Sequence, residues 1–181
     1  ERLIALENRL NALDAKVGDG DTGSTFAQGA RDIAQWLEED RLPLNDLPQL
    51  LLVVGERLAT VMGGSSGVLM SIFFTAAGQA LRSGKPLPDA LLTGLAQMKH
   101  YGGADLGDRT LIDALQPALE AWQKEGLQAA VRAAKEGADA TTSMGKAGAG
   151  RSSYVNKENL QGVADPGAVA VAEVFAALVR L

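Results

Sequence analysis

The sequence predicts an all-α fold, an array of about eight antiparallel helices. Apolar residues recur at intervals of three and four along nearly all of the 181 residues. No segment alternates with the period of two that a half-buried strand shows, and the one strand-like run, Leu50–Val54, lies inside a longer helical window. With 46% hydrophobic and 22% charged residues, the composition is that of an ordinary globular protein. We therefore expect one helical domain over residues 1–181.

Four helices are expected in the first half of the chain. Each contains apolar residues that return to one helical face, as Leu3, Leu6, Leu10 and Leu13 do in the first. The expected spans are Leu3–Leu13, Phe26–Leu37, Leu47–Met62 and Val68 to about Leu81.

Four more helices are expected in the second half. Their starting points are indicated by Pro88 or Asp89, by Asp108 as an N-cap, by Ala129 and by Pro166, which suits the first helical position. The first three would end near His100, Trp122 and Thr142, and Pro117 should kink the second of them.

Charge and composition exclude several classes of function. The net charge is −5 without a Lys/Arg cluster, so nucleic acid is not an expected partner. Cysteine is absent, which excludes disulfides and agrees with the cytoplasmic location that we expect. The longest apolar run, Val68–Ala77, is too short to cross a bilayer.

The chain begins at Glu1 inside a helical pattern without an initiator Met, so we expect a fragment of a longer protein.

Three aspartates, Asp14, Asp19 and Asp21, form the most informative feature. They occupy a short stretch that Gly18 and Gly20 interrupt, and a new helix follows it. Carboxylates this close repel one another unless a cation lies between them, and hard oxygen ligands suit Mg²⁺ or Ca²⁺. The N–H groups at the start of the following helix would face a phosphate. The stretch thus predicts a metal and nucleotide site, and the alternative is a solvated acidic turn with a helix cap.

Other motifs that overlap this stretch do not fit. Gly18–Gly23 matches G-x-G-x-x-G in form, but it follows a helix and contains two acids that would repel a pyrophosphate. An EF-hand would need Gly and Glu where the chain has Ser24 and Ala30. A Walker A motif is absent from the sequence.

Glycine-rich segments precede several of the expected helices. Glycine permits positive φ and lets backbone N–H groups approach a ligand, and nearby hydroxyls and Arg151 could contact phosphate oxygens. Any one such segment alone is typical of a turn. In an antiparallel array alternate connections share one end, so the set favours a phosphate site. The segments are Gly63–Gly67, Gly102–Thr110, Gly145–Tyr154 and Asp165–Gly167.

Taken together, these motifs resemble those of the nucleotide-binding (L) domain of dihydroxyacetone kinases. The resemblance rests on Gly18–Gly23, Met62–Gly67, Gly107–Thr110, Ala149–Tyr154 and Asp165–Gly167, in the family's order and over essentially the whole chain. It implies an antiparallel barrel of eight α-helices.

The resemblance also assigns residues. Asp14, Asp19 and Asp21 would hold Mg²⁺ that bridges the nucleotide phosphates, and Arg151 would be the catalytic residue that offsets charge on the transferred phosphoryl group. The remaining nucleotide contacts would fall on Thr22, Gly23, Ser24, Thr25, Ser65, Ser66, Gly102, Leu111, Arg151, Asp165, Pro166 and Gly167. His100, the single histidine, matches no motif of the family and is interpreted as a residue at a helix end.

The activity implied is transfer of a phosphoryl group to dihydroxyacetone held by a separate K domain, so that this chain alone should bind nucleotide and phosphorylate no ketone. The residues of these motifs resemble those of the ATP-dependent branch of the family, in which K and L domains are fused. The alternative is an L subunit that holds ADP tightly as a cofactor of the phosphotransferase system and also binds a transcriptional regulator. Fused relatives further imply a homodimer, and some relatives hold a lipid inside the barrel, which leaves a lipid-binding module as another reading.

Overall fold

The computed structural model describes residues 1–179. Among these residues there are ten α-helices, two short 3-10 helices and no strand, which confirms the all-α class. The chain divides into two compact units. Unit 1 consists of Glu1 with Thr25–Gly102, and unit 2 consists of Arg2–Ser24 with the described residues from Gly103 onward.

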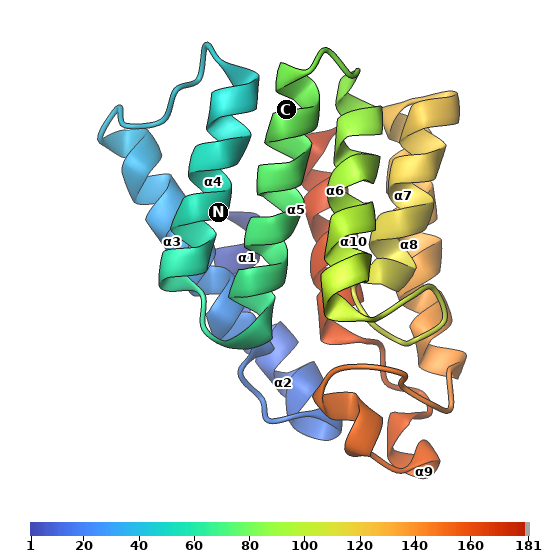
Figure 1. Ribbon diagram of the computed structural model, residues 1–181. Coiled ribbons are helices and arrows are strands. Elements are labelled where there is room, and N and C mark those ends of the chain that lie inside the picture. The colour runs from blue at the N-terminus through green and yellow to red at the C-terminus, as the bar shows by residue number, and fades with distance from the viewer. Residues whose placement is uncertain (180–181) are drawn as a thin grey trace. The chain divides into compact units, whose positions relative to one another are not determined.

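Unit 1 contains most of α3 (Thr22–Glu38) and all of α4 (Leu47–Val61), α5 (Gly64–Arg82) and α6 (Leu87–Gly102). Short connections make α4, α5 and α6 antiparallel neighbours, which Figure 1 shows in cyan to yellow-green. Glycine permits close contact between them, because a Cβ at Gly94 would collide with the carbonyl of Phe73. The buried side chains of the unit include Leu58, Phe73 and Met98.

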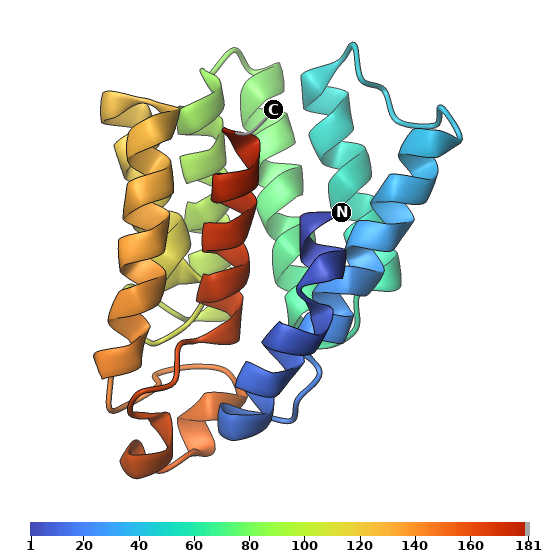
Figure 2. The same ribbon diagram turned by 180° about the vertical axis from the view of Figure 1, so that it is seen from behind.

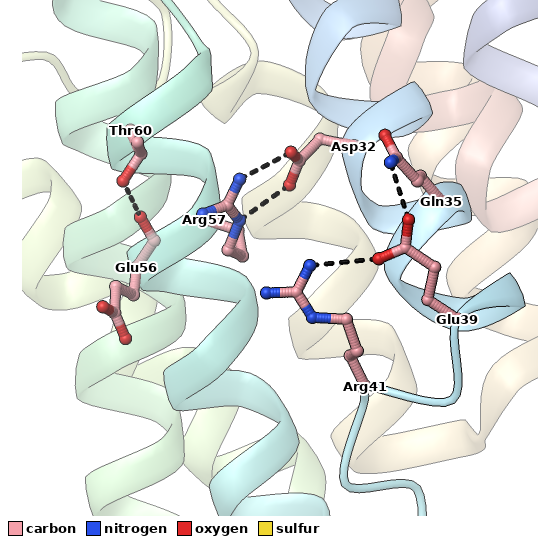
Figure 3. Close-up of polar contacts among 7 residues, drawn as sticks. All are labelled: Asp32, Gln35, Glu39, Arg41, Glu56, Arg57 and Thr60. Carbon is pink, nitrogen blue, oxygen red and sulfur yellow. Dashed lines mark hydrogen bonds and ion pairs between the residues drawn. The ribbon is translucent and has the colours of Figure 1, made fainter.

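A polar contact joins α3 to α4 (Figure 3). The guanidinium of Arg57 donates two hydrogen bonds to Asp32, with N–O distances of 2.9 and 2.6 Å. The same guanidinium lies 4.4 Å from the ring centre of Trp36, and that of Arg41 lies 3.8 Å from it. Arg41 in turn donates to Glu39 at 3.0 Å. The end of α3 is thereby fixed against α4.

Unit 2 contains α1 (Arg2–Ala5), α2 (Glu7–Val17), α7 (Ile112–Glu125), α8 (Leu127–Ala140), α9 (Lys157–Leu160) and α10 (Pro166–Leu178), with 3-10 turns at Thr141–Ser143 and Arg151–Tyr154. Helices α7 and α8 form an antiparallel pair joined at Gly126, whose φ of +90° favours glycine. Helix α10 packs on α8, α7 and α2 (Figure 2, red). Small side chains permit this packing, since Ala138 of α8 lies in one buried cluster with Ala114 of α7 and Ala168 of α10.

The structure corrects several expected boundaries. The first expected helix is interrupted at Leu6, so that it forms α1 and α2. Helix α5 begins at Gly64 and not at Val68. Asp108 is not the N-cap of α7, which begins at Ile112. The short helix α9 was not expected.

The boundaries of other elements agree with expectation. Helix α4 covers nearly the expected span, and α10 begins at Pro166. His100 lies in the last turn of α6 and stacks edge-on against Tyr101, which confirms its interpretation as a residue at a helix end. No helix in the described part of the chain is long and apolar enough to cross a membrane.

Candidate functional site

Asp14 organises the loop between α2 and α3. It lies in the last turn of α2 and is buried. Its Oδ2 accepts hydrogen bonds from the backbone N–H groups of Gly20, Asp21 and Thr22, at 3.1, 3.0 and 3.0 Å. A Cβ at Gly18 would collide with its Oδ1, so a larger residue there would displace this carboxylate. The loop is thus wrapped around one carboxylate.

The three predicted aspartates come together at this loop. Carboxylate oxygens of Asp14, Asp19 and Asp21, one from each residue, all lie within 4.8 Å of one another, and the last two residues are exposed. Partial burial raises the pKa of Asp21, the negative charges of Asp19 and Asp14 raise it further, and Arg151 acts in the opposite direction. An acidic cluster of this spacing fits a hard divalent cation.

Arg151 supplies a positive charge to the same cluster. It opens the 3-10 turn after Gly150, whose φ is +72°. Its Nη1 lies 2.5 Å from Oδ2 of Asp19, and the two side chains are 72% and 32% exposed. The guanidinium is therefore next to the acids and free enough in solvent to change partners.

The start of α3 is already capped by side chains of α2. The N–H of Thr22 donates to Asp14, and the N–H of Ser24 donates to Oδ1 of Asn11 at 3.0 Å. The hydroxyl of Ser24 donates to Glu7 at 3.0 Å and accepts from Asn11 at 2.9 Å. Gly23 is buried between them, where a Cβ would collide with the carbonyl of Glu7. Phosphate contacts from Thr22 N–H and Ser24 would have to replace these hydrogen bonds.

Leu111 and the Asp165–Gly167 turn lie together in unit 2. A Cβ at Gly167 would be 3.1 Å from that of Leu111. Oδ2 of Asp165 accepts from the N–H of Ala168 at 2.8 Å and so caps α10, and Pro166 occupies the first turn. Burial raises the pKa of Asp165 to about 6, against the opposing effects of the Ala168 N–H and of Arg109.

The other predicted residues belong to unit 1. Thr25 lies in the first turn of α3, and Gly102 is the last residue of α6. Ser65 and Ser66 lie in the first turn of α5 and not in a loop, with Ser65 exposed and Ser66 half-buried. This places two hydroxyls at a helix N-terminus, a position that favours anions. Unit 1 also has a groove of about 630 Å³ along α5 and α6, and none of the predicted residues lines it.

Sequence reasoning did not identify four polar residues around the site. Asn11 follows Glu7 by four residues and Asp14 follows Asn11 by three, so the three residues share one face of α2, and this spacing was a usable signal. Arg109 and Asp113 are both buried. Asp113 accepts hydrogen bonds from residues close to it in the sequence, whereas Arg109 donates to Val163 across the fold, a contact for which the local sequence gives no signal.

The fold and the site define a class, that of all-helical domains with a three-carboxylate cluster where one helix ends and the next begins. The model of the DAK2 domain family matches residues 16–180. The chain therefore belongs to the DAK2 domain family.

Named relatives and solved structures agree with this assignment. The chain is 63% identical over 178 residues to dihydroxyacetone kinase of Citrobacter freundii and 44% identical over 191 residues to triokinase/FMN cyclase of Rattus norvegicus. These matches cover 97% and 99% of the chain and 32% of each relative, so the chain spans about a third of their length. The native crystal structure of the C. freundii kinase matches with a TM-score of 0.88 and 60% identity, over 99% of this chain and 32% of that one. The structure of its complex with AMP-PNP and Mg²⁺ matches with a TM-score of 0.85 and 57% identity, over 99% and 31%.

Proposed function

We propose that this chain is the Mg²⁺- and nucleotide-binding domain of a dihydroxyacetone kinase and that it supplies the phosphoryl group of ATP. The observation that carries the proposal is the cluster of Asp14, Asp19 and Asp21, with carboxylate oxygens within 4.8 Å of one another. The related C. freundii kinase, 57% identical over the matched region, was crystallised with AMP-PNP and Mg²⁺. Bound Mg²⁺ would neutralise charge on the phosphates of the nucleotide.

Each predicted residue would have its own role in binding the nucleotide. The three aspartates would hold the metal, and Thr22–Thr25, Ser65 and Ser66 would contact phosphate oxygens. Arg151 is already at the edge of the cluster, 2.5 Å from Asp19, and its planar guanidinium would exchange that carboxylate for the transferred phosphoryl group. Gly102 and Leu111 would contact the base, and the Asp165–Gly167 turn would complete the site.

The acceptor would be bound elsewhere. The chain spans about a third of the length of its relatives, which supports a separate K domain as its partner. Phosphoryl transfer depends on positioning and charge neutralisation, so a domain that holds the nucleotide can serve an acceptor held by another domain. Alone, this chain would bind nucleotide without phosphorylating dihydroxyacetone.

Reconstitution tests this proposal. The chain is mixed with a separately produced K domain, dihydroxyacetone, Mg²⁺ and ATP, and the formation of dihydroxyacetone phosphate is followed by a coupled enzyme assay. We expect product only when both proteins are present, and Asp21→Asn should abolish it while Arg132→Lys, on the exposed face of α8, should not. Product formed by the K domain alone, or full activity of Asp21→Asn, would contradict the proposal.

The donor is tested on the purified chain before any nucleotide is added. Native mass spectrometry should show no nucleotide that co-purifies with the chain, and ATP and ADP that are added afterwards should exchange freely. ADP that co-purifies and resists exchange would instead assign the chain to the phosphotransferase-linked type, with ADP as cofactor.

A further inference from the structure

Arg109 is a buried cation that the proposed reaction does not use. Its side chain is fully buried, and its Nη2 donates a hydrogen bond of 2.6 Å to the carbonyl of Val163. Its Nε and Nη1 have no hydrogen-bond partner among the described residues. Its φ of +59° is also unusual for a residue with a side chain. Each of these features is costly, so the position of this guanidinium requires an explanation.

The loop that carries Arg109 is fixed on one side to α7. Oδ1 of Asp113 accepts from the N–H of Gly107 at 2.6 Å, and Oδ2 accepts from the N–H of Thr110 at 2.8 Å. These bonds hold the loop over the first turn of α7. Leu111 follows directly, so its position depends on this loop.

On its other side Arg109 reaches the segment that leads into α10. Val163, whose carbonyl it binds, lies two residues before Asp165. Burial lowers the pKa of the Arg109 guanidinium, and the negative charges of Asp165 and Asp113 oppose this effect. Asp165 is fixed independently, because its N–H donates to the hydroxyl of Thr141 at 2.9 Å. Arg109 thus links the loop before Leu111 to the Asp165–Gly167 turn.

We propose that Arg109 is a positioning residue that fixes Leu111 against the Asp165–Gly167 turn and thereby sets the affinity for the base and ribose end of the nucleotide. The inference rests on the nucleotide-binding function proposed above. Arg109 is fully buried, so it touches no ligand and acts only through the two segments that it joins. The phosphate end is held by other groups, the aspartate cluster and the start of α3. A ligand that lacks a base should therefore not depend on Arg109.

Calorimetric titration of Arg109→Lys separates the two ends of the ligand. Lysine keeps the positive charge but loses the planar fork that binds Val163 and faces two carboxylates. We expect affinity for Mg²⁺-ATP to fall by about tenfold, and affinity for Mg²⁺-tripolyphosphate to stay within about twofold of the parent chain. The matched control is Arg132→Lys, an exposed arginine of α8 in the same unit, which should change neither affinity.

Two results would overturn the inference. One is an unchanged affinity of folded Arg109→Lys for ATP, and the other is an equal loss for both ligands, which a merely structural role predicts. If the parent chain binds no ATP, the proposed nucleotide function itself fails, so the two failures are distinguishable.

Hydrogen–deuterium exchange of the parent chain tests the same link without a variant and applies even if Arg109→Lys does not fold. Mg²⁺-ATP should slow exchange in residues 103–111 and 161–168 together, and Mg²⁺-tripolyphosphate should slow it in neither. Protection of only one segment by ATP, or of both by tripolyphosphate, would overturn the inference.

Discussion

The carboxylate of Asp14 has two tasks. Its Oδ2 accepts three backbone hydrogen bonds and holds the loop, and one of its oxygens lies within 4.8 Å of carboxylate oxygens of Asp19 and Asp21, where a cation would bind. Asp19 and Asp21 are exposed and less involved in the loop's structure. Substitutions of the three aspartates should therefore affect metal binding alike and stability differently.

We predict that Asp14→Ala lowers the free energy of unfolding by about 1–3 kcal/mol, because it leaves three N–H groups without an acceptor. Asp19→Asn should change it little. Urea unfolding followed by circular dichroism at neutral pH measures both. Equal stability of the two variants would contradict the structural task assigned to Asp14.

A metal ion bound at the aspartate cluster would compete with Arg151 for Asp19. The ion pair is largely exposed, so it contributes about 0–1 kcal/mol, and its removal should strengthen binding of Mg²⁺ alone by up to about fivefold. Arg151→Ala should at the same time weaken binding of ATP, which loses a cationic partner. Titrating the variant with Mg²⁺ in the absence of nucleotide, and then with ATP, checks whether Mg²⁺ binding becomes stronger and ATP binding weaker. Weaker Mg²⁺ binding would show that the guanidinium does not compete with the ion.

Asp165 should make stability depend on pH. Its pKa in the fold, about 6, lies above the ordinary value of 3.8, so folding favours the protonated carboxyl. Its contribution to stability is therefore complete below the unfolded value and is lost as the pH rises through about 6. By linkage, the free energy of unfolding changes by about 3 kcal/mol in total between low and high pH because of this group.

The variant Asp165→Asn isolates this effect, because asparagine can still cap α10 but does not titrate. The difference in unfolding free energy between the parent chain and the variant, measured in urea at about pH 5 and pH 8, should favour the parent more at the lower pH. A difference that does not change with pH would contradict the raised pKa.

At the scale of elements, the contact between α3 and α4 includes one well-formed ion pair (Figure 3). Asp32 and Arg57 are 16% and 23% exposed and share two hydrogen bonds. We predict that Arg57→Ala lowers the free energy of unfolding by about 2 kcal/mol, because Asp32 loses its partner in a partly buried place. Arg41→Ala is the matched control, because Arg41 also stacks on Trp36 but is half exposed. This variant should lose less unfolding free energy than Arg57→Ala. Thermal unfolding of both variants compares them, and equal losses would argue against the Asp32 pair.

Helices with a clear apolar period and a local start signal were predictable. Helix α4 begins at Leu47, where its apolar pattern starts, and α10 begins at Pro166, which suits the first helical position. The starts of α5 and α7 were not predictable. Helix α5 extends into a glycine-rich segment that resembles a loop, and Asp113 holds the residues before α7 in a turn, where Asp108 was expected to cap the helix.

At the scale of the whole molecule, part of the site was likewise predictable from local sequence and part was not. The aspartate cluster was predictable because its three members lie within eight residues of one another. The link from Arg109 to Val163 spans 54 positions and became visible only in the fold. The eight-helix barrel, the homodimer and an internal lipid remain predictions from the resemblance.

The central claim is that the three aspartates hold the metal through which this chain binds ATP. Calorimetric titration of the 181-residue chain with ATP, with and without Mg²⁺, tests it most directly when the parent is compared with Asp19→Asn. We predict binding by the parent only with Mg²⁺, and loss of that binding in Asp19→Asn while its helicity is unchanged. ATP binding that is equal with and without Mg²⁺, or that survives in Asp19→Asn, would contradict it.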